Sequence, residues 1–265
     1  MKVVDKIKKR LEKKNHTVDV GSLLEIEDVK SFIETLNPDD KIVIVGGDGT
    51  LHRLANTLQN HTVSNDIYVA RKAGTGNDFV RSLKQKGFLI RINDYIENIP
   101  HAKLSTGEEF FFLNSVGAGL DSYVCYLVNG SIEGKTEGNY FRSAYKAFKE
   151  FKRHEIKLTI DGKEIEFKDA WFSVVANSKY FGGGMKISPK SVRDDDVLEV
   201  VVIKGIPKFW LILIFPTIYL GIHTIFKRWV KMYKGKQVII ESKIDNYVQM
   251  DGEAFYPVKR IEVRR

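Results

Sequence analysis

Three glycines within four positions follow a short apolar run early in the chain. The run is Ile42–Val45, and the residues after it are Gly46, Gly47, Asp48, Gly49 and Thr50. A glycine turn between a buried strand and a helix exposes backbone N–H groups, which bind phosphate well beside a helix N-terminus. We therefore expect a buried strand, a phosphate-binding turn, and a helix with the apolar stripe Leu51, Leu54, Ala55 and Leu58.

A second turn of the same kind follows the apolar run Ile67–Ala70. Its residues are Gly74, Thr75, Gly76, Asn77 and Asp78, and a helical pattern resumes at Phe79, Val80 and Leu83. Two consecutive strand–turn–helix units would bring both turns to one edge of a sheet. The ordinary interpretation is two helix entries with Thr50 and either Asn77 or Asp78 as N-caps. Capping does not require the extra glycines, which indicate a close approach to the backbone.

The third feature is Asp251-Gly252-Glu253, which follows the apolar residues Val248–Met250. Asp-Gly is typical of hairpin turns, and a turn is all we expect of the earlier pair Asp161-Gly162. The position of the later triplet, after two glycine turns, gives it a second interpretation as a source of carboxylates.

Taken together, these three motifs resemble the diacylglycerol kinase catalytic family, which includes sphingosine-type and soluble bacterial lipid kinases. The likeness runs from about Lys2 to the C-terminus, and the first turn is more distantly similar to that of NAD kinases and phosphofructokinases. The resemblance implies transfer of phosphate from ATP, with Mg²⁺, to a lipid hydroxyl, with diacylglycerol preferred. It places the nucleotide phosphates on residues 46–50 and 74–78, makes Asp251 the general base, and puts Glu253 beside it.

These assignments agree with the chemistry of phosphoryl transfer. The reaction depends on positioning and on neutralising the triphosphate, which backbone N–H groups and a metal can supply. Asp48 is expected to hold Mg²⁺ through water or to orient the γ-phosphate, since Mg²⁺ uses few carboxylates. A carboxylate such as Asp251 is suited to accept the proton of the attacking hydroxyl.

A further acidic run, Asp194-Asp195-Asp196, has two interpretations. The simpler one is a solvated turn before the strand predicted over 197–203. Similar bacterial lipid kinases carry Asp-Asp-Gly or Asn-Asp-Gly here, with the middle Asp on a structural Mg²⁺. The resemblance therefore implies a metal ligand at Asp195, with the backbone carbonyls of Val192 and Val197 as companions. Asp196 replaces the usual glycine and puts the turn geometry in question.

Two departures from the family pattern bear on activity. The usual first strand and its Asn-Pro-x-Ser/Ala-Gly turn are missing, so we expect a truncated start and a first helix with the stripe Val3, Val4, Ile7 and Leu11. Lys103 stands where relatives carry an acidic residue. A non-catalytic lipid- or nucleotide-binding relative is therefore one alternative, and a soluble NAD kinase-like metabolite kinase is another.

Composition and charge set the expected surroundings of the chain. Its 265 residues include a single cysteine, Cys125, which fits a reducing cytoplasm, and carry a formal net charge of +8. The basic balance favours a peripheral place at an anionic membrane. Nucleic acid is a weaker choice, since no recognised binding motif accompanies the lysines. A homodimer is also a possible assembly.

The apolar segment Phe209–Phe226 contains no formally charged side chain. We expect a helix that breaks near Pro216, rather than a membrane span, because strands of one domain flank it. It could lie in a membrane interface or over a lipid-entry cleft. A buried core helix is the alternative, and His223 is expected to be hydrogen-bonded rather than a metal ligand.

The fold class expected is α/β with two domains. Residues 1–98 would form a mainly parallel, NAD kinase-like nucleotide domain without its first strand, and residues 99–265 a β-sandwich with helices for the lipid substrate. Glycines 117, 119 and 182–184 are expected in loops near the cleft, the last three either covering substrate or making a sharp turn. The predicted strands of the second domain are 110–115, 155–160, 164–167, 170–176, 197–203, 237–241 and 247–250, with a helix over 139–151.

Overall fold

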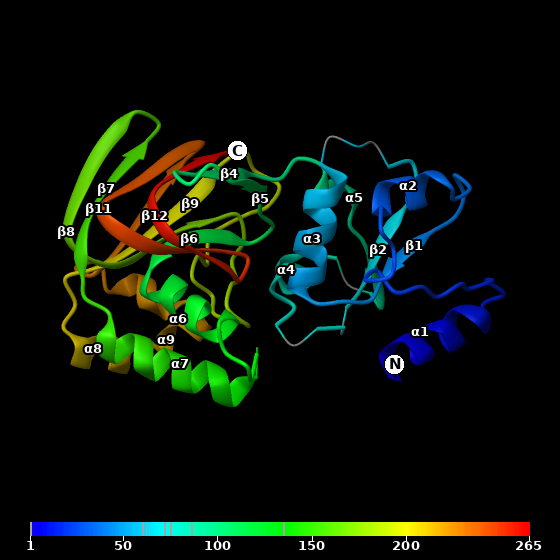
Figure 1. Ribbon diagram of the computed structural model, residues 1–265, viewed down its shortest axis with the longest axis horizontal. Helices are drawn as coiled ribbons and strands as arrows, with labels where there is room; N and C mark the ends of the chain where they lie inside the picture. Colours follow the sequence, from blue (N-terminus) through cyan, green and yellow to red (C-terminus); the bar gives the residue numbers. More distant parts are fainter. Residues whose placement is uncertain are drawn as a thin grey trace. The chain divides into compact units, whose positions relative to one another are not determined.

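The protein is described by a computed structural model that covers residues 2–59, 61, 63–71, 73–74, 76–85, 87–134 and 136–265. The chain divides into two compact units, Met1–Glu97 and Asn98–Arg265 (Figure 1). Each unit has its own sheet and its own buried side chains.

Unit 1 is a small α/β unit. In its described part, three strands form a sheet in the order β1-β2-β3, with β1 parallel and β3 antiparallel to β2. Its elements are α1 (Lys2–Glu12), α2 (Val29–Glu34), β1 (Ile42–Ile44), α3 (Asp48–Leu58), β2 (Ile67–Ala70), α4 (Asp78–Ser82), β3 (Leu89–Arg91) and α5 (Asn93–Ile96).

The apolar patterns of unit 1 are mostly confirmed. The four residues of the α3 stripe are buried, as are Phe79, Val80 and Leu83 at α4. The prediction that β1 is buried is wrong: its three residues are half-buried, because β1 lies at the edge of the described sheet while β2 has neighbours on both sides. In α1, Ile7 is buried but Val3 is 43% exposed, so the predicted stripe is only partly covered.

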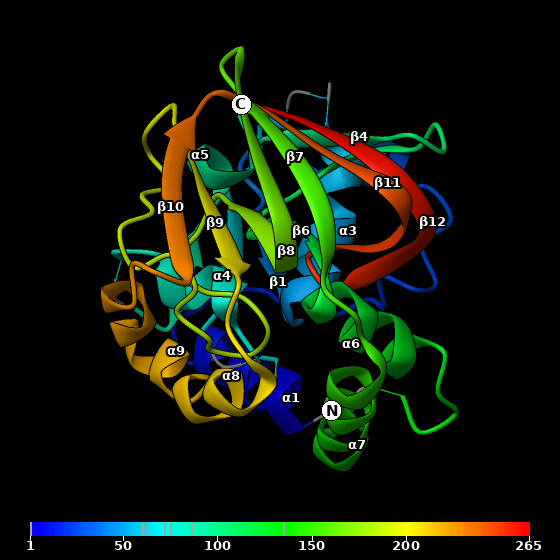
Figure 2. The ribbon, with the colours of Figure 1, turned by 90° about the vertical axis from the view of Figure 1, so that its left-hand side faces the viewer.

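Unit 2 is built on an antiparallel sheet. In its described part, nine strands pair in the order β10-β9-β8-β6-β11-β12-β4-β5, and β7 pairs with both β8 and β11. The strands are β4 (His101–Leu104), β5 (Glu109–Phe111), β6 (Ser115–Gly119), β7 (His154–Ile160), β8 (Lys163–Ala176), β9 (Leu198–Lys204), β10 (Val230–Gly235), β11 (Gln237–Met250) and β12 (Glu253–Arg264). Helices α6 (Leu120–Asn129), α7 (Glu137–Glu150), α8 (Lys208–Ile214) and α9 (Thr217–Leu220) lie on one side of this sheet (Figures 1 and 2).

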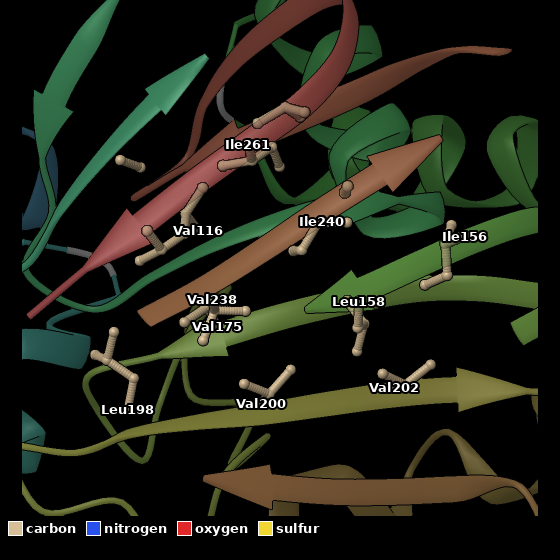
Figure 3. Close-up of a cluster of buried hydrophobic side chains, with 14 of the residues drawn as sticks. Val116, Ile156, Leu158, Val175, Leu198, Val200, Val202, Val238, Ile240 and Ile261 are labelled. Atoms are coloured by element: carbon tan, nitrogen blue, oxygen red, sulfur yellow. The ribbon is translucent and has the colours of Figure 1, made fainter. Parts of the chain in front are cut away.

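The side chains of the central strands alternate between two cores. Val175, Val200 and Val202 point into one cluster with residues of β7, β11 and β12 (Figure 3). Val174 and Val201 point the other way, into a second cluster with α6, α8 and α9. This period of two is what a strand dictates when both faces of its sheet are covered.

Several predicted boundaries in unit 2 are wrong. The strand expected over 110–115 is two strands, β5 and β6, and the ranges 164–167 and 170–176 belong to one strand, β8. Gly117 and Gly119 lie inside β6 rather than in loops. A Cβ on Gly119 would overlap the backbone of Phe172 on β8, so glycine is required there by strand packing. Helix α6 and strands β4, β10 and β12 were not predicted.

The expectations for the apolar segment and the glycine triplet fare better. The helix breaks at Pro216, with α8 before it and α9 after it, and a 3₁₀ turn, η1 (Ile222–Ile225), follows. Gly182–Gly184 all have positive φ, and Phe181 pairs with Met185 across them, which is the sharp-turn alternative. Within the described residues, no helix combines the length and apolar character needed to cross a membrane.

Candidate functional site

The first glycine turn joins β1 to α3 by close packing. Gly47 is the N-cap of α3, with extended backbone and no side-chain cap. A Cβ on Gly46 would overlap the side chain of Thr50, while a Cβ on Gly49 would meet nothing within 4 Å. The prediction that Thr50 caps the helix is wrong, because the helix begins two residues earlier, at Asp48.

The structure brings the two glycine turns of unit 1 together. The Asp48 carboxylate accepts hydrogen bonds from the backbone N–H groups of Asp78, at 3.0 Å, and Phe79, at 2.9 Å. A Cβ on Gly74 would overlap Gly47 Cα, so these two glycines permit one turn to lie against the other. Part of the glycine pattern is therefore explained by contact between the turns, and Asp48 links them across 30 residues of sequence.

The second turn is held by its own side chains. Asn77 has a left-handed φ of 53°; its Oδ1 accepts from Gly74 N at 3.0 Å, and its Nδ2 donates to Gly74 O. Asn77 is the N-cap residue of α4, but its side chain does not cap the helix. Asp78 is buried, and its Oδ1 lies 3.4 Å from Nη1 of Arg81. Gly76 lies in the same turn, and Thr75 lies outside the described residues.

In unit 2, Asp251 holds a neighbouring segment of backbone. It lies in the hairpin turn between β11 and β12 with a φ of 47°. Its carboxylate accepts from the N–H groups of Leu113 at 2.5 Å, Asn114 at 2.8 Å and Ser115 at 3.1 Å. Its own N–H donates to Ser115 O at 3.0 Å. The predicted base is therefore also an anchor for the segment that leads into β6.

Glu253 is the first residue of β12 and is exposed. Between it and Asp251, Gly252 donates its N–H to Gln249 Oε1 at 3.1 Å and accepts from Asn129 of α6 at 3.0 Å. The turn thus has defined contacts on both sides. The roles of Asp251 and Glu253 in catalysis stay predictions.

The carbonyl side of the same segment is held by residues that sequence reasoning did not assign to the site. Arg193 donates to Leu113 O and, at 2.5 Å, to Asn114 Oδ1. Asn177, at the end of β8, donates from Nδ2 to Leu113 O at 3.0 Å. Asn114, Asn177 and Arg193 are all buried. A polar residue directly after an apolar strand, as at Asn177, is the signal that could have found this network.

A second aspartate near the Asp-Gly-Glu turn is Asp121, in the first turn of α6. Its Oδ2 is inaccessible to solvent and has no hydrogen-bond partner among the described residues, although other atoms of the residue are partly accessible. Burial raises the pKa of the Asp121 carboxyl to about 7, and hydrogen bonds from Ser122 and Gln249 oppose that rise. Gln249 also accepts from Gly252, so Asp121 and the turn share a neighbour.

The acidic run before β9 forms a turn. Asp195 Oδ1 accepts from Val197 N at 3.3 Å, and Asp196 lies 3.5 Å from Lys236. Val192 is 37% exposed. No cluster of three or more His, Cys, Asp or Glu side chains with metal-binding geometry occurs among the described residues. Carboxylate and carbonyl oxygens are donors that Mg²⁺ accepts, so the composition of the turn fits the predicted metal, whose presence stays a prediction.

Two further features lie outside these turns. Lys103 is exposed in β4, where its cross-strand neighbours are Glu109 and Glu262, so opposite charges flank the lysine that replaces the usual acid. An apolar cavity of about 30 Å³ lies under α8 and α9, and none of the predicted site residues lines it.

Comparison with known families gives matches over both units. A family described as the YegS C-terminal NAD kinase beta sandwich-like domain matches residues 114–263, and the diacylglycerol kinase catalytic domain matches residues 1–106. Together these two matches cover nearly the whole chain.

Individual relatives have low sequence identity to this chain, but the matched regions cover most of both proteins. YtlR of Bacillus subtilis (strain 168), classed by its name among lipid kinases, is 28% identical over 250 residues, covering 80% of this chain and 74% of YtlR. A diacylglycerol kinase of Mycobacterium tuberculosis (strain CDC 1551 / Oshkosh) is 24% identical over 227 residues, covering 83% of this chain and 72% of its own length.

Solved structures agree on the fold. A crystal structure of a Bacillus anthracis (strain Sterne) protein described as a diacylglycerol kinase has a TM-score of 0.62 and 24% identity, covering 89% of this chain and 78% of that protein. Another from the same organism has a TM-score of 0.54 and 21% identity, with coverages of 89% and 76%. At these identities the likeness establishes the fold, a two-part α/β and β-sandwich-like architecture.

Proposed function

This chain belongs to the family of diacylglycerol kinase catalytic and YegS-like lipid kinases, and from that premise we propose that it phosphorylates diacylglycerol with ATP. The γ-phosphate passes to the lipid hydroxyl and the product is phosphatidic acid. The observation that carries the proposal is the pair of glycine turns in unit 1, held together through the carboxylate of Asp48.

The paired turns suit a triphosphate for two physical reasons. The absence of side chains at Gly46, Gly47, Gly49, Gly74 and Gly76 would let phosphate oxygens approach the backbone, with the N–H of Gly74 already donated to Asn77 Oδ1. The N-terminus of α3 adds its positive dipole end at the first turn. Asp48 joins the turns through two hydrogen bonds, and a site ordered in this way would lose less entropy on binding nucleotide.

The acceptor side of the proposal rests on Asp251. In this role the carboxylate accepts the proton of the lipid hydroxyl as the new phosphate ester bond forms. Leu113, Asn114 and Ser115 fix the orientation of that carboxylate through their N–H groups. Glu253 supplies a second carboxylate one residue beyond the turn.

Mg²⁺ is the metal proposed for this reaction, where it would neutralise charge on the nucleotide phosphates. Asp48 would bind it through water. Asp195, with the backbone carbonyls of Val192 and Val197, would hold a second, structural ion in the turn before β9.

The test is transfer of label from γ-labelled ATP in detergent micelles containing one acceptor at a time. The acceptors are diacylglycerol, a long-chain sphingoid base and, without lipid, NAD. We expect labelled phosphatidic acid and little label elsewhere. Label on NAD would favour a soluble metabolite kinase. A folded preparation that binds ATP but labels none of the acceptors would reject the kinase proposal.

A further inference from the structure

The segment formed by α8, α9 and η1 presents a large apolar surface to its surroundings. We call this surface the outer face. Its nine large side chains are each 43–70% exposed: Phe209, Trp210, Ile212, Leu213, Phe215, Tyr219, Leu220, Ile222 and Ile225. Taking about 180 Å² for each side chain, the exposed area is on the order of 900 Å².

The inner side of the same segment already completes the core. Leu211 and Ile218 are buried against the sheet, and His223 Nε2 lies 3.0 Å from Ile187 O. Lys208 Nζ donates to Lys149 O at 2.9 Å, which ties the start of α8 to the end of α7. The segment thus buries Leu211 and Ile218 against the sheet and leaves the nine side chains of the outer face largely exposed.

Exposing such an apolar face to water is energetically unfavourable. A surface helix of a globular protein pairs an apolar inner face with a polar outer one, and a helix that is apolar all round normally lies in a core or in lipid. Large exposed apolar patches on soluble domains mark interaction sites. The arrangement of α8 and α9 at the margin of the helical layer leaves this face accessible within unit 2 (Figure 2).

The segment that carries the outer face is flanked in sequence by basic residues, and the Asp169 carboxylate, which lies against Gly205 before α8, pairs with Arg153. Residues 201–240 contain seven Lys or Arg and no Asp or Glu. Lys234 and Lys236 pair with Glu199 and Asp196, away from the apolar segment. The residues that flank the segment directly are Lys204, Lys208, Lys227, Arg228 and Lys231.

We propose that the outer face is the docking surface of this protein for an anionic lipid bilayer. The apolar side chains enter the interface while flanking basic residues such as Lys227 and Arg228 contact acidic headgroups. With seven residues in α8 and four in α9, the segment lies in the interface and does not cross it. The inference rests on the proposed function for its purpose, which is access to a membrane-dissolved acceptor.

The charges that flank the outer face favour an anionic bilayer over a second copy of the chain as its binding partner. Two copies meeting through the same face would bring two sets of basic residues together, and like charges across an interface oppose association. An anionic bilayer instead matches both the apolar centre and the basic margin.

The decisive measurement is binding to phosphatidylcholine vesicles with and without phosphatidylglycerol, made without ATP. We expect the wild type to bind the mixed vesicles, and the double variant F209S/L220S to bind at least about tenfold more weakly. The matched control is L24S/I132S, which removes two apolar side chains with exposures of 82% and 106% elsewhere on the chain. The control should bind within about twofold of wild type.

A charge variant tests the second half of the proposal. K227Q/R228Q should weaken binding to mixed vesicles and reduce its salt dependence, whereas K163Q/K168Q, with the same loss of charge on the β7–β8 hairpin, should not. Equal binding by F209S/L220S and wild type would overturn the proposal. So would sedimentation analysis in which that variant dissociates a dimer while vesicle binding is unchanged.

Failure of docking and failure of the kinase proposal give different results. If F209S/L220S phosphorylates a short-chain, water-soluble diacylglycerol like wild type but loses activity on vesicles, both proposals stand. Vesicle binding that depends on the outer face, in a protein that transfers no phosphate, keeps the docking surface and rejects the kinase. Activity on vesicles that neither F209S/L220S nor K227Q/R228Q reduces keeps the kinase proposal and rejects the docking surface.

Discussion

Two Asp-Gly turns of unit 2 share a backbone conformation and a hydrogen-bonding role. Asp161 and Asp251 both have a φ of 47°, each precedes a glycine with positive φ, and each closes a hairpin. Asp161 accepts from the N–H groups of Lys236 and Gln237, at 3.0 and 2.9 Å, much as Asp251 accepts from the segment before β6. Local sequence alone therefore does not separate a purely structural turn from the turn proposed for the site.

The two turns differ in what surrounds them. Asp161 is exposed, and its partners belong to the tight connection between β10 and β11. Asp251 is half-buried, and the segment that it holds is also bound by the buried side chains of Arg193 and Asn177. The same turn chemistry thus serves an edge connection in one place and a buried polar network in the other. This difference suggests how to separate anchoring from catalysis.

The largest expected effect is on turnover. Replacing Asp251 by Asn removes a proton acceptor, so kcat should fall by about 10²–10⁴-fold with little change in ATP affinity. Asp161→Asn is the matched control and should leave kcat within about twofold. Initial rates and ATP binding measured on both variants check this. Wild-type turnover by Asp251→Asn would leave Asp251 as an anchor only.

Asp121 offers the opposite case, a carboxylate whose Oδ2 has no described partner. Because burial raises its folded pKa from 3.8 to about 7, the folded state gains stability from the protonated form below about pH 4 and loses it as pH rises towards 7. The loss amounts to about 4 kcal/mol as an upper value. Urea unfolding across pH 4–8 should therefore show Asp121→Asn stabilised relative to wild type at pH 8 and nearly equal at pH 4. Parallel pH profiles would contradict the assigned burial.

Removing the carboxylate of Asp251 should lower the free energy of unfolding more than removing the carboxylate of Asp161. Glycine tolerates the left-handed φ at both positions, so Asp251→Gly and Asp161→Gly lose the hydrogen bonds without new strain. We expect a loss of about 3 kcal/mol at position 251, where the N–H groups of three buried residues lose their acceptor, and about 1 kcal/mol at position 161. Urea unfolding measures both. Equal losses would mean that the buried network does not depend on Asp251.

The smallest expected effect concerns Asp48, which holds backbone amides in unit 1 as the turn aspartates do in unit 2. In Asp48→Asn, an amide N–H₂ must face the N–H of Asp78 or Phe79, so the two glycine turns should loosen. We expect ATP to bind about tenfold more weakly. Asp39→Asn, an exposed change in the same unit, is the control. Unchanged ATP binding by Asp48→Asn would separate the turns from nucleotide binding.

The sequence predicted those parts of the fold that depend on neighbouring residues, and it failed where contacts between distant segments decide the structure. β2 and the stripe of α3 were predicted correctly, because their burial follows from period and strand length. Gly117 and Gly119 were misplaced in loops. Gly119 must be glycine because β8 approaches it closely, a contact between residues more than 50 positions apart that no local pattern records.

The candidate site divides in the same way. The glycine turns and the Asp-Gly-Glu triplet were recognised from residue type and order, and the catalytic and metal roles given to them remain predictions. The network of Asn114, Asn177 and Arg193 was missed, since each residue is unremarkable within its own segment.

The sequence by itself determined the elements that hydrophobic period and turn chemistry encode, and through its motifs it determined the family. Tertiary structure decided which amides each aspartate holds, because a carboxylate's partners are set by the segment that packs against it rather than by adjacent residues. It also decided which side of α8 and α9 is exposed. A segment that is apolar all round has the same sequence pattern whether it is buried or exposed, and only packing against the sheet selects the buried side.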